Sequence, residues 1–310
     1  MKIFQQIGKL FGAILLASVF VLSGINPVSA ADEDTLPQYR LQISPAKIDI
    51  GDLKPGEKYS DVVKVQNTGK NAFDFKMSVV PYSVKDENYT QAYESKEHYN
   101  DIVEWVNFHT STGHLEPNTQ EEIAYTINVP ADVPAGGQYA ILMAEIVNQD
   151  DDQSASGVTT IRRVGALLYS NIEGNTRKTG NIVENKIPSI LFNPPVSATS
   201  IVENTGNTHT TATYVLQVLP LFGGEEVYTN EEDPATLTIL PETRRFNTIT
   251  WPGAPALGIF RVKQTVTLWD QTSTTEKIVF LCPIWFIFIV LLIIFCAIFW
   301  IFSRVRSRKQ

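Results

Sequence analysis

The chain has 310 residues, of which 44% are hydrophobic and 19% are charged, so it is long enough for about two domains with cores of their own. Leaving two N-terminal lysines and four C-terminal cations out of the 25 basic residues gives 19 against 33 acidic ones, a net charge of about −14 for the body. Because phosphate binding requires basic surfaces, this charge argues against nucleic acid as a partner.

The N-terminus has the three parts of a secretory signal peptide. Lys2 and Lys9 precede an apolar run from Leu10 to Leu22, and Pro27 is followed by small residues that end at Ala30. The run is too short to cross about 30 Å of hydrocarbon. We therefore expect residues 1–30 to be a signal peptide that is cleaved after Ala30.

One pattern occurs twice along the chain. The stretch VKVQNTGKNAFDFKMSVVP ends at Pro81, and SIVENTGNTHTTATYVLQVLP ends at Pro220. Both contain Asn-Thr-Gly and then a strand in which alternate residues are apolar, which is typical of a half-buried β-strand. The predicted inward-facing residues are Phe73, Phe75, Met77 and Val79 in the first copy and Ala212, Tyr214, Leu216 and Val218 in the second.

Turn residues surround both copies of this pattern. Asn and Gly tolerate positive φ, so Asn67–Gly69 and Asn204–Gly206 are predicted to be tight hairpin turns. Pro55 and Gly56 suit the central positions of a type II turn. Later in each half, a turn with proline, an alternating strand, a Pro-rich connection and another strand follow in the same order.

These signals predict an all-β fold class. Short strands separated by frequent turns indicate two tandem immunoglobulin-like β-sandwich domains, followed by a single C-terminal transmembrane helix. The predicted domains are a first β-sandwich at 40–172, a linker at 173–180 and a second β-sandwich at 181–271.

The first domain is larger because it contains an aromatic insertion, YSVKDENYTQAYESKEHYNDIVEWVNF, that has no counterpart of equal length. Trp105 lies among apolar residues and is expected in the core, where a short helix is also expected. The tyrosines in the polar part are the better candidates for surface contacts, because aromatic rings are large, rigid and amphipathic. The predicted ligand-contact residues are Tyr89, Tyr93 and Tyr99.

No residue constellation supports catalysis or metal binding. The histidines have no metal-ligand spacing with a carboxylate; they are His98, His109, His114 and His209. Asp150–Asp152 lacks the spacing of a calcium loop and is expected at a solvated hairpin tip. We therefore predict a protein that is not an enzyme and has no cofactor.

The tetrapeptide Leu240–Thr243 resembles the core of a sortase recognition motif. Arg244 occupies the position where that motif requires glycine, and the tetrapeptide corresponds in the repeat to Leu115–Asn118. We interpret it as a turn, with the following apolar segment retained as the membrane anchor.

The C-terminus has the pattern of a membrane span. Residues Ile278 to Phe302 contain no charge, and 303–310 form a basic tail that is expected to stay on the cytoplasmic side. Cys282 and Cys296 lie within this predicted span, about 21 Å apart along a helix, and are too distant to pair. The body of the chain is therefore expected outside the cytoplasm.

The whole succession resembles the WxL-interacting protein family of bacterial cell surfaces. The resemblance is carried by ISPAKIDIGDLKPGEKYSDVVKVQNTG, LEPNTQEEIAYTINVPADVPAGGQYAILMAEI and RRVGALLYSNIEGN, followed by a second β-domain, one span and a basic tail. It implies a first domain that binds peptidoglycan and a second that binds host or partner surface proteins.

Taken together, these patterns predict a membrane-anchored cell-envelope binding or scaffold protein. Its expected partners are cell-wall peptidoglycan, surface proteins or a host ligand, which would contact exposed edge strands or end loops. The alternative is a membrane-tethered assembly chaperone similar in domain plan to the two-domain pilus chaperones.

Overall fold

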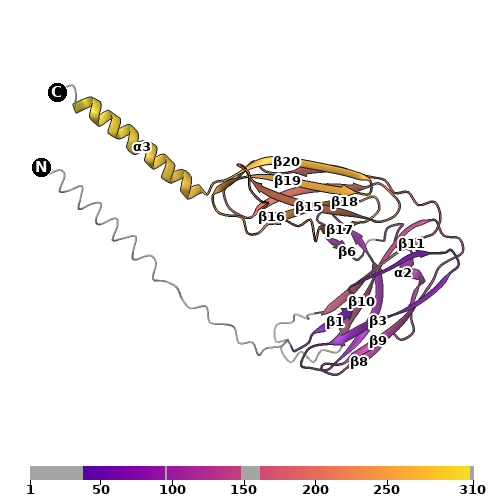
Figure 1. Ribbon diagram of the computed structural model, residues 1–310. Helices are drawn as coiled ribbons and strands as arrows, with labels where there is room; N and C mark the ends of the chain where they lie inside the picture. The colour runs from indigo at the N-terminus through magenta and orange to yellow at the C-terminus, as the bar shows by residue number, and fades with distance from the viewer. Residues whose placement is uncertain (1–37, 95, 148–160, 308–310) are drawn as a thin grey trace. The chain divides into compact units, whose positions relative to one another are not determined.

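The computed structural model describes residues 38–94, 96–147 and 161–307 of the chain (Figure 1). The predicted signal peptide, Asp150–Asp152 and the last three residues lie outside the described residues. Strands dominate the fold, and they form two β-sandwiches that belong to one unit beginning at Tyr39, followed by an apolar helix. The predicted fold class, two tandem immunoglobulin-like sandwiches with a C-terminal apolar helix, is confirmed.

The first sandwich consists of two facing sheets. One sheet has the order β1-β3-β9-β7, with bounds Leu41–Ser44, Lys58–Asn67, Gln120–Asn128 and Val106–Phe108. The other has the order β2-β11-β10-β4-β8, with bounds Lys47–Leu53, Arg163–Ile172, Gly136–Val147, Phe73–Pro81 and Thr112–Leu115. The insertion contributes a small pair and one helical turn: β5 Ser83–Val84, β6 Gln91–Ala92 and α2 Ile102–Trp105.

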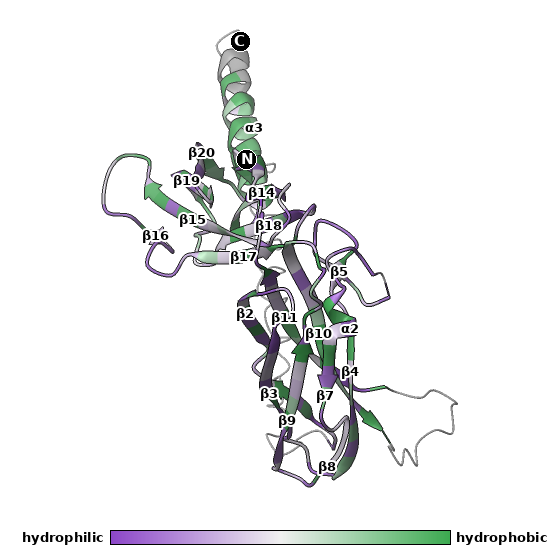
Figure 2. Ribbon diagram, turned by 90° about the vertical axis from the view of Figure 1, so that its right-hand side faces the viewer, coloured by the Kyte–Doolittle hydropathy of each residue, from purple (hydrophilic) through white to green (hydrophobic). Residues whose placement is uncertain are grey.

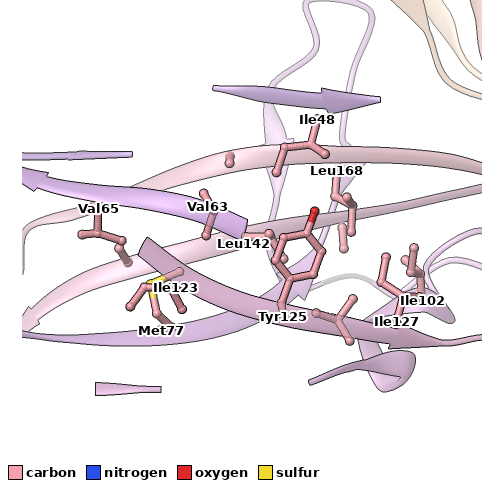
Figure 3. Close-up of a cluster of buried hydrophobic side chains, with 14 of the residues drawn as sticks. Ile48, Val63, Val65, Met77, Ile102, Ile123, Tyr125, Ile127, Leu142 and Leu168 are labelled. Carbon is pink, nitrogen blue, oxygen red and sulfur yellow. The ribbon is translucent and has the colours of Figure 1, made fainter. Parts of the chain in front are cut away.

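Alternating residues of these strands fill the first core (Figure 3). Val63 and Val65 of β3 and Tyr125 of β9 lie opposite Leu142 of β10 and Leu168 of β11. The predicted inward residues Phe73, Phe75 and Met77 are buried in this core, and Val79 packs against it. Trp105 also belongs to it, as predicted. The period of two that the sequence shows therefore reports which face of each strand is inside.

The second sandwich repeats the plan with a smaller sheet. Its three-stranded sheet has the order β12-β14-β18, with bounds Gly180–Lys186, Val196–Asn204 and Arg244–Trp251. The larger sheet has the order β13-β20-β19-β15-β16, and β17 also pairs with β15; the bounds are Ile190–Leu191, Gln271–Leu281, Gly258–Leu268, Thr210–Pro220, Tyr228–Thr229 and Ala235–Ile239. The four inward residues predicted for the second copy are all buried: Ala212, Tyr214, Leu216 and Val218.

The Asn-Thr-Gly motifs connect the two sheets of each sandwich, and the prediction that they form hairpin turns is wrong. In the first copy the motif lies between β3 of one sheet and β4 of the other, and neither Asn67 nor Gly69 has positive φ. Asn67 is buried, and its Nδ2 donates to Asn71 O at 2.9 Å and Leu115 O at 3.1 Å. Its Oδ1 accepts from Gly69 N at 2.9 Å. The motif thus serves as a side-chain bridge across the corner.

Asn204 makes the same bridge in the second sandwich. Its Nδ2 donates to Thr208 O at 2.8 Å and Ile239 O at 3.0 Å, and its Oδ1 accepts from Gly206 N at 2.9 Å. A buried asparagine that satisfies two carbonyls and one N–H group explains why this short motif occurs in both halves.

Two other predicted turns are confirmed. Gly56 has a φ of 80°, and Glu57 N donates to Lys54 O at 2.9 Å, as in a type II turn. Leu240–Thr243 is also a turn, closed by Thr243 Oγ1 donating to Leu240 O at 2.9 Å. Its counterpart in the first sandwich is Glu116–Thr119, closed by Thr119 Oγ1 donating to Glu116 O at 2.7 Å, which lies one residue later than the predicted Leu115–Asn118.

The second sandwich extends further than predicted. The sequence predicts its end at Gln271 and the start of the span at Ile278, but β20 continues to Leu281 and α3 covers Ile284–Ser307. Val279 and Leu281 are buried in the second core, whereas Ile278 and Phe280 are exposed. The alternation of exposed and buried residues cannot be recognised in the sequence, because all four residues are apolar and continue into the apolar helix.

The helix α3 is long and apolar enough to cross a membrane, with a mean hydropathy of 3.2 over Ile284–Ile301 (Figure 2). Pro283 precedes its first residue and accepts a hydrogen bond from Phe286 N at 2.9 Å, so the proline falls where its missing N–H is harmless. Cys282 lies before the helix and Cys296 within it, which corrects the prediction that both belong to the span.

Candidate functional site

The larger sheet of the first sandwich has apolar side chains on both faces. Residues 140, 142 and 144 of β10 face the core, and Ile141 and Met143 face outward into a second cluster. The insertion and one residue of the second sandwich, Leu240, cover part of this outer face. The full cluster consists of Tyr82, Tyr99, Tyr139, Ile141, Met143, Tyr169 and Leu240.

Tyr99 lies inside this outer cluster, so the prediction that it is exposed is wrong. Its side chain is only 5% exposed, and its ring meets that of Tyr139 edge to face with centroids 5.6 Å apart. The neighbouring Asn100 fixes this part of the insertion, because its Nδ2 donates to Tyr82 O at 3.0 Å and Tyr139 O at 2.7 Å. Tyr99 therefore holds the insertion on the sheet.

Tyr89 is also not a free surface residue, because it reaches the second sandwich. Its hydroxyl accepts a hydrogen bond from Leu240 N at 2.8 Å and lies 2.7 Å from Thr243 Oγ1. The guanidinium of Arg245 lies 4.1 Å from its ring centroid. Burial raises the pKa of Tyr89 to about 12. The sortase-like tetrapeptide is thus a docking turn for Tyr89.

A second set of contacts joins the two sandwiches around His209. Its backbone N–H donates to Tyr139 Oη at 2.7 Å, and its ring meets those of Tyr139 and Tyr169 edge to face, with centroids 5.5 and 5.3 Å apart. Asn207 O accepts from Gly137 N at 2.8 Å. Desolvation lowers the pKa of the His209 imidazole, and Asp49, 4.0 Å from Nε2, opposes this effect.

Sequence reasoning missed this interface, although the repeat contains a signal for it. The equivalent turns hold exposed Glu116 in the first sandwich and buried Leu240 in the second. Counting from the two Asn-Thr-Gly motifs, Ala72 corresponds to His209. Equivalent positions of the two sandwiches that differ in polarity indicate where one sandwich makes a contact that the other does not make.

Of the three predicted tyrosines, Tyr93 is the one that faces solvent. It is 43% exposed, and it lines a cleft of ≈ 540 Å³ beside β6 and β11. Ile141, Met143 and Leu167 give the cleft an apolar floor, and Gln91 and Arg163 supply polar groups at its rim. Large apolar surfaces with a few polar groups are typical of binding sites.

The cleft lies along an unpaired stretch of strand. β11 pairs with β10 along its whole length, but its pairing with β2 begins only at Leu167, whose N–H donates to Ala46 O at 2.9 Å. Arg162 O is directed to β10, so by alternation the backbone groups of Arg163 and Gly165 are directed to the other side. No hydrogen bond within the described residues reaches them there.

A second cleft, of ≈ 600 Å³, lies on the other side of this open edge. Leu41, Ile43 and Lys64 are among its lining residues, and it shares Ala46, Val164 and Gly165 with the first cleft. A Cβ at Gly165 would lie 2.4 Å from Ile141 Cγ2, so packing against β10 requires glycine at this position. The site therefore offers backbone hydrogen-bonding groups with a recess on either side.

The charges near the open edge are balanced. Arg163 Nε lies 3.8 Å from Glu145 Oε2, and Lys64 Nζ lies 3.2 Å from Glu122 Oε1. In the described part of the chain, no group of three His, Cys, Asp or Glu residues is arranged to hold a metal ion. The arrangement is suited to binding an extended, largely uncharged segment.

The chain was compared with family models, curated proteins and solved structures. No family model and no curated protein matches the chain. Among solved structures, it is similar to the class 5 fimbriae chaperone CfaA, with 13% identity, TM-score 0.38, and coverage of 77% of this chain and 99% of the other.

Two further solved structures have similarly low identities and TM-scores. One is the Salmonella enterica SafA pilin in complex with the SafB chaperone, with 12% identity, TM-score 0.36 and coverage of 80% and 99%. The other is the CsuC-CsuE chaperone and tip-subunit complex from Acinetobacter baumannii, with 11% identity, TM-score 0.37 and coverage of 77% and 98%. At these identities and TM-scores the similarity assigns no function to the chain.

Proposed function

We propose that this chain is a membrane-anchored binding protein of the cell envelope that holds an extended segment of a protein partner at the open edge of β11. The observation that carries the proposal is the unpaired backbone at Arg163 and Gly165, between clefts of ≈ 540 and ≈ 600 Å³. An incoming strand would satisfy these backbone groups and place alternate side chains in the two clefts.

The site favours a peptide over a glycan for a physical reason. Backbone N–H and C=O groups at a sheet edge match the spacing of another strand, and an apolar floor formed by Ile141, Met143 and Leu167 favours an apolar side chain. Tyr93 would contact that side chain at the rim. A sugar ring could stack on Tyr93 but would not need the strand edge.

The anchor is helix α3, and the proposed orientation places both sandwiches outside the cytoplasm. The mean hydropathy of 3.2 and the basic residues Arg304 and Arg306 at the end of the helix support this orientation. The predicted signal peptide supports the same route of export. Within the envelope, an acidic body keeps the protein soluble and disfavours docking on acidic polymers.

The resemblance to the WxL-interacting protein family suggests two further ligands, peptidoglycan for the first sandwich and a host or surface protein for the second. A membrane-tethered assembly chaperone is the second candidate function, and the open edge favours it equally, because strand addition also serves transient binding of folding subunits. The two functions differ in how long the partner stays bound.

The proposal is tested by removing one donor from the edge. In full-length protein, Arg163→Pro deletes the N–H that faces the open side and leaves the β10 ladder intact, and Arg163→Gln is the matched control that keeps this N–H. We expect a partner recovered from detergent-solubilised envelope with wild type and the Gln variant to be lost with the Pro variant.

The outcomes separate the candidate functions. Equal recovery with all three proteins would overturn binding at this edge. Release of the partner over time, with many different subunits recovered, would favour the chaperone, and a single stable partner would favour the scaffold.

If Arg163→Pro lowers the melting temperature, Tyr93→Ser replaces it, because Tyr93 is exposed and lines the same cleft. If the protein sediments with purified cell wall and neither variant changes this, the ligand is peptidoglycan and it binds at another surface of the protein.

A further inference from the structure

One end of the second sandwich exposes apolar side chains. Phe222 is 91% exposed, Leu257 is 47% exposed and Phe192 is 46% exposed. Single exposed apolar residues are common on protein surfaces, but a group of large ones at one place marks an interaction site. Phe222 precedes Gly223 and Gly224, which have φ of 85° and 126°, so it lies in a turn that glycine makes possible.

The strand registers place these three residues at the same end. Gly258 pairs with Leu281 and Pro220 pairs with Phe260, so the segments that contain Leu257 and Phe222 are both close to the end of β20. On the other side of β20, Leu191 pairs with Leu281, and Phe192 follows directly. We call Phe192, Phe222 and Leu257 the apolar rim.

This end is also the point where the chain leaves the sandwich for α3. Only Cys282 and Pro283 lie between β20 and the first helical residue, and Cys282 N donates to Leu191 O at 3.0 Å. Two residues span at most about 7 Å. If α3 crosses a bilayer, its start lies near the membrane surface, and the rim must lie near that surface too. Trp285, 58% exposed in the first turn, is a residue type that prefers this interface.

We propose that the apolar rim inserts into the interfacial layer of the bilayer and holds the second sandwich on the membrane surface. This proposal rests on the proposed membrane anchoring and adds a contact that anchoring alone does not require. The occupant is lipid, because the two-residue connection brings lipid to the rim before any other partner. Burial of aromatic and aliphatic side chains in this layer is favourable, as for interfacial helices.

The charges beside the rim define the kind of surface. Glu225 and Glu226 follow Phe222 in the same loop and are exposed. Carboxylates are repelled by anionic headgroups, so the contact depends on apolar burial and suits a zwitterionic phosphatidylcholine surface without net charge. The proposal therefore predicts insertion without anionic lipid.

The test uses full-length protein, one chain per phosphatidylcholine nanodisc, with Cys282 and Cys296 replaced by alanine. A nitroxide label is placed by Phe222→Cys or Leu257→Cys, and Val62→Cys, in the first sandwich and 42% exposed, is the matched control. We expect the labels at 222 and 257 to lose access to a water-soluble nickel complex and gain access to oxygen, whereas the label at 62 stays accessible to nickel.

The proposal would be overturned if the nickel complex reached the labels at 222 and 257 as readily as the label at 62. It would also be overturned if the labels at 222 and 257 were protected from nickel only in discs that hold two chains. A label placed by Leu291→Cys in α3 separates this failure from failure of the anchor. Protection at 291 with access at 222 and 257 rejects the rim contact alone, and access at 291 rejects the membrane span itself.

Discussion

Asn67 and Asn204 show how a single side chain can define a corner of a β-sandwich. Each is buried at the end of a strand of one sheet and uses both hydrogens of its amide and one lone pair to bind two backbone groups of the connecting corner and one carbonyl of the other sheet. Aspartate could keep the bond to the glycine N–H but could not donate to the two carbonyls. The repeat is therefore preserved where hydrogen-bond geometry requires this residue.

Replacing either asparagine should destabilise its own sandwich. Asn67→Ala leaves two carbonyls and one N–H without their partner, which we expect to cost about 2–4 kcal/mol in the free energy of unfolding. Asn67→Asp should be intermediate or equally severe, because a buried carboxylate faces two carbonyl oxygens. Chemical denaturation of the two sandwiches checks this, and an unchanged midpoint would show that the corner forms without the bridge.

The tyrosines of the insertion have opposite roles, and removing one hydroxyl from each distinguishes them. Tyr89→Phe leaves Leu240 N–H without its acceptor, so we expect a loss of about 1–3 kcal/mol. Tyr93→Phe removes an exposed hydroxyl whose partner is the neighbouring Gln91. Its effect on stability should stay within about 0.5 kcal/mol. Equal melting temperatures for the two variants would mean that Tyr89 is not held by the second sandwich.

At the scale of elements, β20 changes where the second sandwich ends. A chain cut after Gln271 loses Val279 and Leu281, each of which contributes roughly 1.5–3 kcal/mol through burial in the core. We expect residues 180–281 to melt cooperatively and residues 180–271 to show no cooperative transition, as measured by circular dichroism. Cooperative melting of the shorter piece would show that β20 is dispensable for the fold.

Local patterns predicted the elements that depend on local periodicity. The sequence predicts Phe75 and Tyr214 in the cores, where they lie, because alternation along one strand reports its own two faces. The same reasoning failed for Ile278 to Leu281, where exposed and buried residues are all apolar. The open edge of β11 could not be predicted either, because it depends on where β2 begins to pair with it.

The prediction that Tyr89 and Tyr99 are surface residues failed for a related reason. A tyrosine in a polar segment is normally exposed, but Tyr89 and Tyr99 are covered by elements far away in sequence. Tyr93 alone remains a candidate contact residue, and its role in ligand binding stays a prediction.

At the scale of the whole molecule, the contact between the sandwiches contains a titratable group. The pKa of His209 is lowered by burial, so the unfolded chain binds more protons than the folded one when the pH falls below the ordinary pKa of histidine, about 6.5. The contribution of neutral His209 to stability is complete above that pH and is lost as the pH falls below it.

We therefore expect the melting temperature of the wild type to fall more steeply than that of His209→Gln between about pH 7.5 and 5.5. Hydrogen bonds to Asp74 and Glu116 raise the pKa of His114, so its protonation stabilises the fold as the pH falls. Both proteins contain His114, so its effect on the melting temperature is the same in the two curves. Parallel curves for the two proteins would show that His209 titrates equally in the folded and unfolded states.

The central claim is that the first sandwich holds a protein partner beside β11, and crosslinking from that site in living cells tests it most directly. A photoreactive amino acid at position 93 of the full chain lies on the cleft, and the same amino acid at position 62 is the exposed control on β3. We predict a discrete protein adduct from position 93 that is absent from position 62 and disappears with Arg163→Pro. Adducts of equal yield from both positions, or adducts at 93 that Arg163→Pro leaves unchanged, would contradict the account.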